Sequence, residues 1–214
     1  PKSMKMIDYN LEEAIKSLVR IGKSIRSNFN IDDHNSNFFT NLIKYQFNDP
    51  SCEFDLNKGL LLHGNIGVGK TIAMMLFEKK LDIKYFPRRY KIVTCREVQM
   101  EFNKSGYDSI QKYSRDSFSK NYHGNGEMLD RNRPLTICFD DLGTEDSQAK
   151  HFGNSTNIMS EIILDRYEMF QRDKMITHFT SNLTASELKN KYGDRVVSRL
   201  REMVNDVVLG GEDR

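Results

Sequence analysis

The sequence predicts an α/β protein whose five-stranded, mostly parallel sheet is sandwiched by helices. From residue 56 onward, short and continuously apolar runs alternate with stretches of helical periodicity. Strands that are apolar on both faces and joined by helical crossovers are typical of a parallel sheet covered on both sides. The chain has 214 residues, enough for one such domain with a core of its own and a short appendage.

Two amphipathic helices are expected before the sheet. The first covers 8–27, where Asp8 is the expected N-cap and apolar residues recur at helical spacing. The second covers 31–47 and is followed by Pro50, which breaks the chain because the residue before a proline avoids the helical region. Together they form an N-terminal helical segment over 1–50.

The strands and their crossovers are expected to follow in regular alternation. The strands are predicted at 59–64, 91–95, 134–141, 175–182 and 206–211. Helices are predicted between them at 70–81, 96–103, 155–171 and 184–203, the last of them broken at Gly193. Segment 104–133 fits neither period and is interpreted as an insertion.

Composition narrows the function classes. With 38% hydrophobic and 29% charged residues the chain is typical of a soluble globular protein, and its net charge of +2 gives no overall attraction to nucleic acid. No apolar run approaches the length of a membrane span, so we expect a cytoplasmic protein with no membrane partner. Cys52, Cys95 and Cys138 form no CxxC pair, which disfavours structural zinc, and the last two are expected to be buried.

A glycine-rich loop predicts a nucleotide site. Residues 64–71 match G-x-x-x-x-G-K-[ST] at every fixed position, after an expected strand and at the start of an expected helix. Such glycines let backbone N–H groups face phosphate oxygens, and the helix adds its positive end. We expect Lys70 to reach the β- and γ-phosphates of ATP and the Thr71 hydroxyl to ligate Mg²⁺. The nucleotide-binding residues are expected to be Gly64, Asn65, Ile66, Gly67, Val68, Gly69, Lys70 and Thr71.

Carboxylates follow the strand predicted at 134–141. Asp140 is expected to hold the hydration shell of Mg²⁺, and Asp141, on the other side, to orient or polarise the attacking water. Two alternatives stay open. In the first alternative, Asp141 only caps the turn at Gly143. In the second, Glu145 instead of Asp141 positions the water.

Polar and basic residues after the fourth strand complete the candidate site. That strand is expected to lie between the two nucleotide strands and ends at Asn182, which is placed to contact the γ-phosphate or the water, or is a routine turn residue. Arg195 and Arg199 lie one helical turn apart, on a face away from the apolar residues. Exposed arginines are usually solvated, but a subunit interface would bring them to a neighbouring γ-phosphate.

Taken together, these motifs resemble the AAA+ ATPases, and within them the helicase-loader and transposition-helper clade of DnaC, DnaI and IstB. The resemblance covers about residues 50–214 and preserves the motif order. It implies an AAA+ P-loop NTPase core over 51–214 without a C-terminal lid domain, with ATP bound between subunits of a ring or helical oligomer. Lys70 and Thr71 would belong to Walker A and Asp140 and Asp141 to Walker B. Asn182 would be sensor 1, and Arg199 the arginine finger with Arg195 beside it.

Three departures from the family pattern leave questions open. The sequence stops just after the fifth expected strand, so a helical lid and its sensor-2 arginine are expected to be absent, which is usual for the clade. Asp141 stands where many AAA+ proteins carry glutamate, although DnaI-like members also show Asp-Asp. The N-terminal segment 1–50, the candidate for partner contact, holds no zinc-ligand cluster of the kind that some loaders use to grip a helicase.

The insertion suggests contact with DNA. Segment 104–133 interleaves cationic and aromatic residues, the usual recipe for single strands, although plain surface loops share this composition. The candidate DNA contacts are Lys112, Tyr113, Arg115, Phe118 and Lys120. The sequence thus favours an Mg²⁺-dependent ATPase that assembles on single-stranded DNA and loads or remodels a replicative helicase. The alternatives are an IstB-like helper of a transposase and an ATP-gated DNA-binding switch with little hydrolysis.

Overall fold

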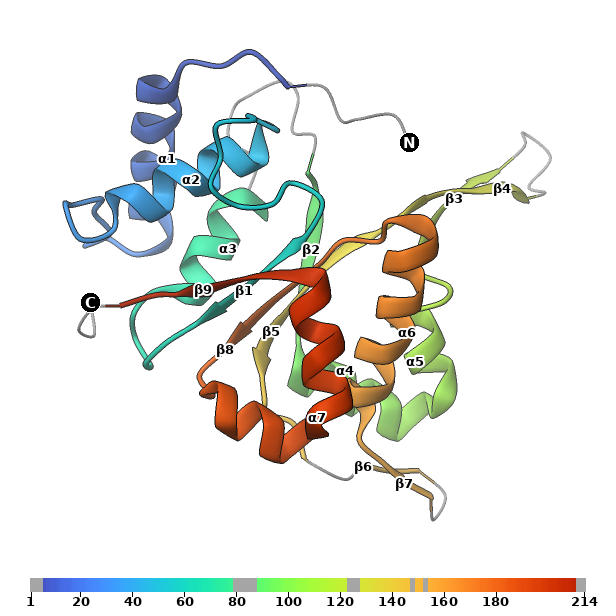
Figure 1. The fold of residues 1–214 in the computed structure, drawn as a ribbon. Helices are drawn as coiled ribbons and strands as arrows, with labels where there is room; N and C mark the ends of the chain where they lie inside the picture. Colours follow the sequence, from blue (N-terminus) through green and yellow to red (C-terminus); the bar gives the residue numbers. More distant parts are fainter. Residues whose placement is uncertain (1–5, 79–87, 123–127, 147–148, 152–153, 211–214) are drawn as a thin grey trace.

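A parallel sheet of five strands forms the centre of the protein. The computed structural model describes residues 6–78, 88–122, 128–146, 149–151 and 154–210 (Figure 1). The strands of this sheet are β1 (Gly59–His63), β2 (Tyr90–Thr94), β5 (Thr136–Leu142), β8 (Thr177–Ser181) and β9 (Val204–Val208). Their order is β2-β5-β8-β1-β9, and every neighbouring pair is parallel. The predicted sheet is confirmed, with β8 between β1 and β5, the strands that precede the glycine-rich loop and end in the two aspartates.

Helices cover both faces of the sheet, and two hairpins extend from it (Figure 1). One face carries α1 (Leu11–Ile25), α2 (Ser36–Gln46) and α3 (Lys70–Glu78). The other carries α4 (Cys95–Ser105), α5 (Tyr107–Tyr113), α6 (Ile158–Asp173) and α7 (Ala185–Met203). The hairpins are β3 (Phe118–Tyr122) with β4 (Met128–Pro134), and β6 (Ala149–His151) with β7 (Asn154–Thr156). No helix in the described ranges has the length and apolarity needed to cross a bilayer.

The N-terminal helices pack as part of the core. Leu18 of α1 and Leu42 of α2 belong to one buried cluster with Leu60 of β1 and Met74 of α3. The helix boundaries differ from prediction: α1 is capped by Asn10, whose side chain accepts the N–H of Glu13 at 3.1 Å, so the N-cap expected at Asp8 was wrong. Helix α2 begins at residue 36 instead of 31. Helices α1 and α2, which lie before residue 50, therefore share a core with β1 and α3.

The segment interpreted as an insertion is more regular than its sequence suggested. It contains the end of α4, α5 and the strands β3 and β4. Gly106, with φ of 60°, separates the two helices. The β3–β4 hairpin projects past the helices that cover the five-stranded sheet (Figure 1). Its sequence therefore lacks the alternation of apolar and polar residues from which a strand is recognised. The helix predicted to 81 is described only to Glu78, and its last residues lie outside the described part of the chain.

A fully buried arginine joins the insertion to the sheet. The guanidinium of Arg166, on α6, donates to four oxygens: Thr177 Oγ1 at 2.7 Å and the carbonyls of Tyr113 at 2.8 Å, Leu135 at 2.9 Å and Ile176 at 3.0 Å. Burial lowers its pKa to about 9, so it stays protonated at neutral pH. These bonds fix the end of α5 and the start of β5 and β8 relative to one another. Cys95 and Cys138 are buried thiols, as predicted.

Candidate functional site

The glycine-rich loop lies at the carboxyl ends of the central strands. The phosphate loop (residues 64–69) joins β1 to α3, which begins at Lys70. Gly67 and Gly69 have φ of 86° and 92°, which L side chains rarely adopt. The loop therefore requires glycine at these positions, and it leads directly into the N-terminus of α3, where free N–H groups favour anions.

The side chains predicted to hold the metal meet across the sheet. The Thr71 hydroxyl donates to both carboxylate oxygens of Asp140, at 2.9 and 3.2 Å. Asp140 ends the apolar part of β5 and is only 4% exposed. Hydroxyl and carboxylate oxygens are the donors that Mg²⁺ prefers, so the pair fits this ion. Sequence reasoning missed a third member: the Thr180 hydroxyl on β8 donates to Asp140 at 2.6 Å. The one feature of the sequence that pointed to Thr180 was its position near the end of the strand expected between the other two motif strands.

The Lys70 ammonium lies against the phosphate loop. Its Nζ donates to the carbonyl oxygens of Gly64 at 2.8 Å and Asn65 at 2.7 Å. Desolvation lowers the pKa of Lys70, while the charges of Asp141 and Asp140 raise it. A third donor of the ammonium is left for an incoming anion. The residues present therefore fit a polyphosphate bound along the loop.

Asp141 differs from Asp140 in its surroundings. It adopts φ of 57°, and its backbone N–H donates to Thr180 Oγ1 at 2.9 Å. Burial raises the pKa of the Asp141 carboxyl, and the charge of Asp140 raises it further, whereas Lys70 and Arg96 lower it. A carboxylate with a raised pKa is suited to accept a proton. The turn after it is closed by the Asp141 carbonyl, which accepts from the N–H and hydroxyl of Thr144.

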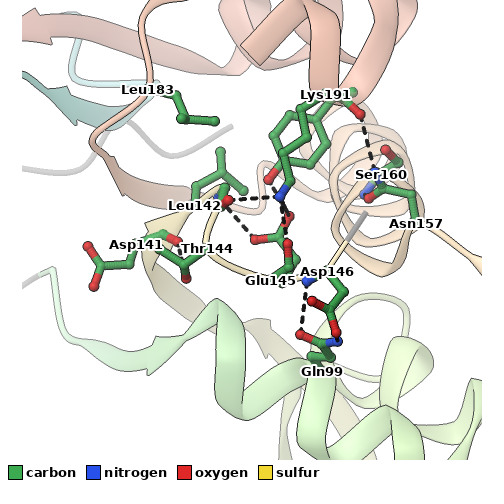
Figure 2. Close-up of polar contacts among 12 residues, drawn as sticks. Gln99, Asp141, Leu142, Thr144, Glu145, Asp146, Asn157, Ser160, Leu183 and Lys191 are labelled. Carbon is green, nitrogen blue, oxygen red and sulfur yellow. Dashed lines mark hydrogen bonds and ion pairs between the residues drawn. The ribbon is translucent and has the colours of Figure 1, made fainter. Parts of the chain in front are cut away.

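Glu145, the other candidate for positioning the water, is occupied in the interior. Its side chain is fully buried, and its carboxylate accepts from the Tyr192 hydroxyl and from the Gly143 N–H at 3.0 Å. Figure 2 shows the Asp141 carboxylate directed away from Glu145. The geometry therefore favours Asp141 over Glu145 as the group open to the nucleotide side.

The remaining predicted residues lie around the strand ends and on α7. Asn182 follows β8 directly and is exposed. Arg195 is exposed on the second half of α7. Arg199, whose side chain is 42% exposed, donates to Glu202 at 2.8 Å and lies over the Tyr167 ring at 4.7 Å. The structure thus pairs Arg199 with groups on α7 and α6 and not with the phosphate loop of its own chain.

A cavity beside the phosphate loop was not predicted. It measures about 400 Å³ and is lined by the connection between α1 and α2, by the phosphate loop and by the chain just after β9. Its lining includes Phe29, Phe38, Val68, Val208 and Leu209. The sequence predicted an amphipathic helix over 31–47, and no motif marked its phenylalanines as part of a site. The cavity brings the connection between the N-terminal helices next to the phosphate loop.

The predicted DNA contacts are partly wrong. Tyr113 and Phe118 are 7% and 9% exposed, and Phe118 packs against Met169 of α6 and Met175 of the connection from α6 to β8, so neither ring face is open to a base. Tyr113 ends α5 and Phe118 begins β3, and at these positions both rings face the core. Lys112 is exposed but bonded to Glu101, and Arg115 is bonded to carboxylates of α6. Lys120 lies on β3, and its side chain is outside the described part of the structure.

The chain is similar to several solved structures of replication proteins. The DnaC helicase loader matches with a TM-score of 0.54 and 17% identity, over 87% of this chain and 96% of the other. Domain III of the replication initiation protein DnaA from Thermotoga maritima matches with a TM-score of 0.52 and 17% identity, over 87% and 67%. DnaA bound to AMPPCP and single-stranded DNA matches with a TM-score of 0.51 and 15% identity, over 87% and 49%.

No protein-family model matches the sequence, and no curated protein matches it. At the identities found, the structural similarity shows the fold alone. The chain has the AAA+ core fold, as the order of its motifs predicted.

Proposed function

We propose that this protein is an Mg²⁺-dependent ATPase that assembles on single-stranded DNA and loads or remodels a replicative helicase. The observation that carries the ATPase part is the meeting of Lys70, Thr71 and Asp140 at one end of the sheet. The helicase part is supported by the fold, which resembles that of the DnaC helicase loader over nearly the whole length of both chains.

Each residue of the site has a role in this proposal. Lys70 binds phosphate oxygens, and Thr71 with Asp140 holds Mg²⁺, which when bound neutralises charge on the β- and γ-phosphates. The base and sugar occupy the cavity beside the phosphate loop. Asp141 orients the attacking water and accepts its proton, and Asn182 donates to the γ-phosphate or the water.

Two other functions compete with this one. A transposase helper would use the same ATPase site with a different partner. An ATP-gated switch with little hydrolysis is favoured by one observation: Glu145 is held in the interior, so the shorter Asp141 is the remaining carboxylate beside Asp140 that is open to the nucleotide.

Turnover and co-purification separate these functions. We expect ATP hydrolysis to rise at least severalfold when single-stranded DNA is added, and a replicative helicase of the same cell or phage to co-purify with the protein. Retention of a transposase in place of the helicase would favour the second function. Turnover near zero with and without DNA, despite tight ATP binding, would favour the switch.

A basic groove that includes one of the predicted DNA contacts, Lys112, offers a path for the strand. It measures about 830 Å³ and lies at the amino ends of β2 and β5, lined by the cations Arg89, Lys91, Lys112 and Arg133 and by one acid, Asp116. All four cations are exposed, and Lys112 is bonded to Glu101. Ser117, also in the lining, has a buried hydroxyl with no hydrogen-bond partner among the described residues. A phosphodiester backbone supplies the acceptors that such a groove lacks, so we place the DNA strand here.

Charge reversal tests this path. The double variant Lys91→Glu with Arg133→Glu is expected to bind a fluorescent oligo-dT at least tenfold more weakly at moderate salt. The salt dependence of its affinity should also be shallower, because a protein that contacts fewer phosphates releases fewer counterions on binding. Turnover without DNA should be unchanged. The matched control, Lys16→Glu with Lys23→Glu, alters the same charge on exposed positions of α1. Equal affinities of the two double variants would place the DNA elsewhere.

A further inference from the structure

The turn that follows β5 is bonded to the helix that carries the two arginines. Within this β5 turn (residues 142–146), the carbonyl oxygens of Gly143 and Glu145 accept hydrogen bonds from Lys191 Nζ at 2.7 and 2.6 Å. The next residue of α7, Tyr192, donates its hydroxyl to the Glu145 carboxylate. Figure 2 shows the Lys191 ammonium reaching into the turn from α7. Two consecutive residues thus hold both the backbone and the side chain of the turn.

The bond to Glu145 is a firm constraint because the carboxylate is out of contact with water. Its remaining partners are the Gly143 N–H at 3.0 Å and the Lys191 ammonium at 3.9 Å. Burial and the neighbouring Glu145 charge raise the pKa of Tyr192, so its hydroxyl keeps the proton that it donates. A buried carboxylate that loses a partner is strongly disfavoured. The β5 turn and this part of α7 are therefore expected to move together.

The other end of the turn is fixed to α4. The side chain of Gln99 donates to the Asp146 carboxylate at 2.6 Å and accepts the Asp146 backbone N–H at 3.0 Å. The Lys191 carbonyl in turn accepts from Asn157, the N-cap of α6, at 3.4 Å. Figure 2 shows both of these contacts beside the turn. The β5 turn is thus bonded to α4 on one side and to α7 on the other. A displacement at the start of the turn is therefore passed to α7 first.

A backbone break separates this attachment from the arginines. Gly193 has φ of 82° and ψ of 162°, after which the helix resumes. A Cβ added there would meet no atom within 4 Å, so glycine is required for the backbone conformation and not for space. The arginine helix (residues 194–203) carries Arg195 and Arg199. It packs Leu200 and Met203 into the core, and it follows directly on the residues, Lys191 and Tyr192, that are bonded to the β5 turn.

We infer that Lys191 and Tyr192 are positioning residues that couple Asp141 to Arg199. This inference rests on the proposed function, in which Asp141 serves the nucleotide of its own subunit, and on the role expected of Arg199 from the sequence, at the nucleotide of the next subunit. Because the β5 turn begins directly after Asp141, a shift of Asp141 on loss of the γ-phosphate reaches Glu145, then Tyr192, and then the arginine helix. Coupling is reciprocal, so the position of Arg199 also biases Asp141.

Hydrogen exchange tests the coupling without requiring turnover. Wild type and Tyr192→Phe are compared with and without a non-hydrolysable ATP analogue and Mg²⁺. In the wild type the analogue is expected to slow exchange in both the β5 turn and the arginine helix. In Tyr192→Phe we expect the arginine helix to lose this protection, while residues 64–71 keep theirs. Full protection of the arginine helix in the variant, or none in the wild type, would overturn the inference, whereas no protection at residues 64–71 would overturn the proposed nucleotide site.

Turnover distinguishes positioning from a loss of folding. Tyr192→Phe is expected to lower kcat about tenfold, a common size for coupling between sites, with the KM for ATP within about twofold of wild type. In an Arg199→Ala background, Tyr192→Phe should lower kcat little further, because both substitutions act through the Arg199 side chain. Losses that multiply in the double variant would show that Tyr192 acts independently of Arg199. Tyr9→Phe is the matched control, since it removes a hydroxyl that donates to Asp49 at 2.7 Å, away from the β5 turn.

Discussion

Replacing Lys70 by alanine is expected to lower ATP turnover about 10²- to 10³-fold, the usual cost of losing one preorganised charge-stabilising donor. The ammonium is buried between the phosphate loop and the two aspartates, so no solvent cation replaces it in the same geometry. The loss should be measured by steady-state hydrolysis, with nucleotide affinity followed separately by a fluorescent ATP analogue.

The residual activity of this variant carries a pH signature. The charge of Lys70 lowers the pKa of Asp141, against burial and the charge of Asp140, which raise it. Removing Lys70 therefore raises this pKa further, and fewer Asp141 carboxyls are ionised at a given pH. The acid limb of the pH profile should move to higher pH. Lys23→Ala, on the exposed side of α1, is the control, and wild-type turnover in Lys70→Ala would contradict the whole site.

The geometry of the candidate site was predictable because its residue types are set by chemistry and local chain geometry. A loop that turns its N–H groups toward phosphate needs glycines at fixed positions, so residues 64–71 could be recognised from one sequence. Asp140 could be placed because apolar parallel strands bring their carboxyl ends to one edge of the sheet, where Thr71 meets it at 2.9 Å.

Features that depend on tertiary partners could not be predicted. Thr180 and Glu145 resemble ordinary strand and turn residues, and their roles arise only from Asp140 and Tyr192, which are distant in sequence. Tyr113 and Phe118 were misassigned because aromatic residues near lysines and arginines have the same composition whether they face DNA or the core. The cavity beside the phosphate loop needs α1, α2 and β9 together, and no local pattern indicates that meeting.

The role proposed for Arg199 depends on a neighbouring subunit. In the single chain its guanidinium is shared between Glu202 and the Tyr167 ring. Because both charged groups of the pair are more than one-third exposed, the pair contributes little to folding. Arg199 can therefore leave Glu202 for a phosphate at small cost, and its removal should not unfold the protein. A loss of activity on substitution of Arg199 can therefore be attributed to its function and not to unfolding.

Arg199→Ala is expected to lower kcat about 10³-fold or more in the assembled protein, because an arginine that meets the γ-phosphate in the transition state is worth that much. ATP binding and thermal stability should stay near wild type. Arg201→Ala, an exposed arginine on the same helix, is the matched control.

Mixing two inactive variants decides whether Arg199 acts between subunits. In an equal mixture of Arg199→Ala with Lys70→Ala, about a quarter of the interfaces combine an intact phosphate loop with an intact neighbouring arginine, if subunits assemble at random. Turnover should therefore return to a sizeable fraction of the wild-type value on mixing. A mixture as inactive as its components, under conditions in which wild-type subunits exchange, would show that Arg199 acts within its own chain, which the structure disfavours because it holds this side chain against α6 and α7.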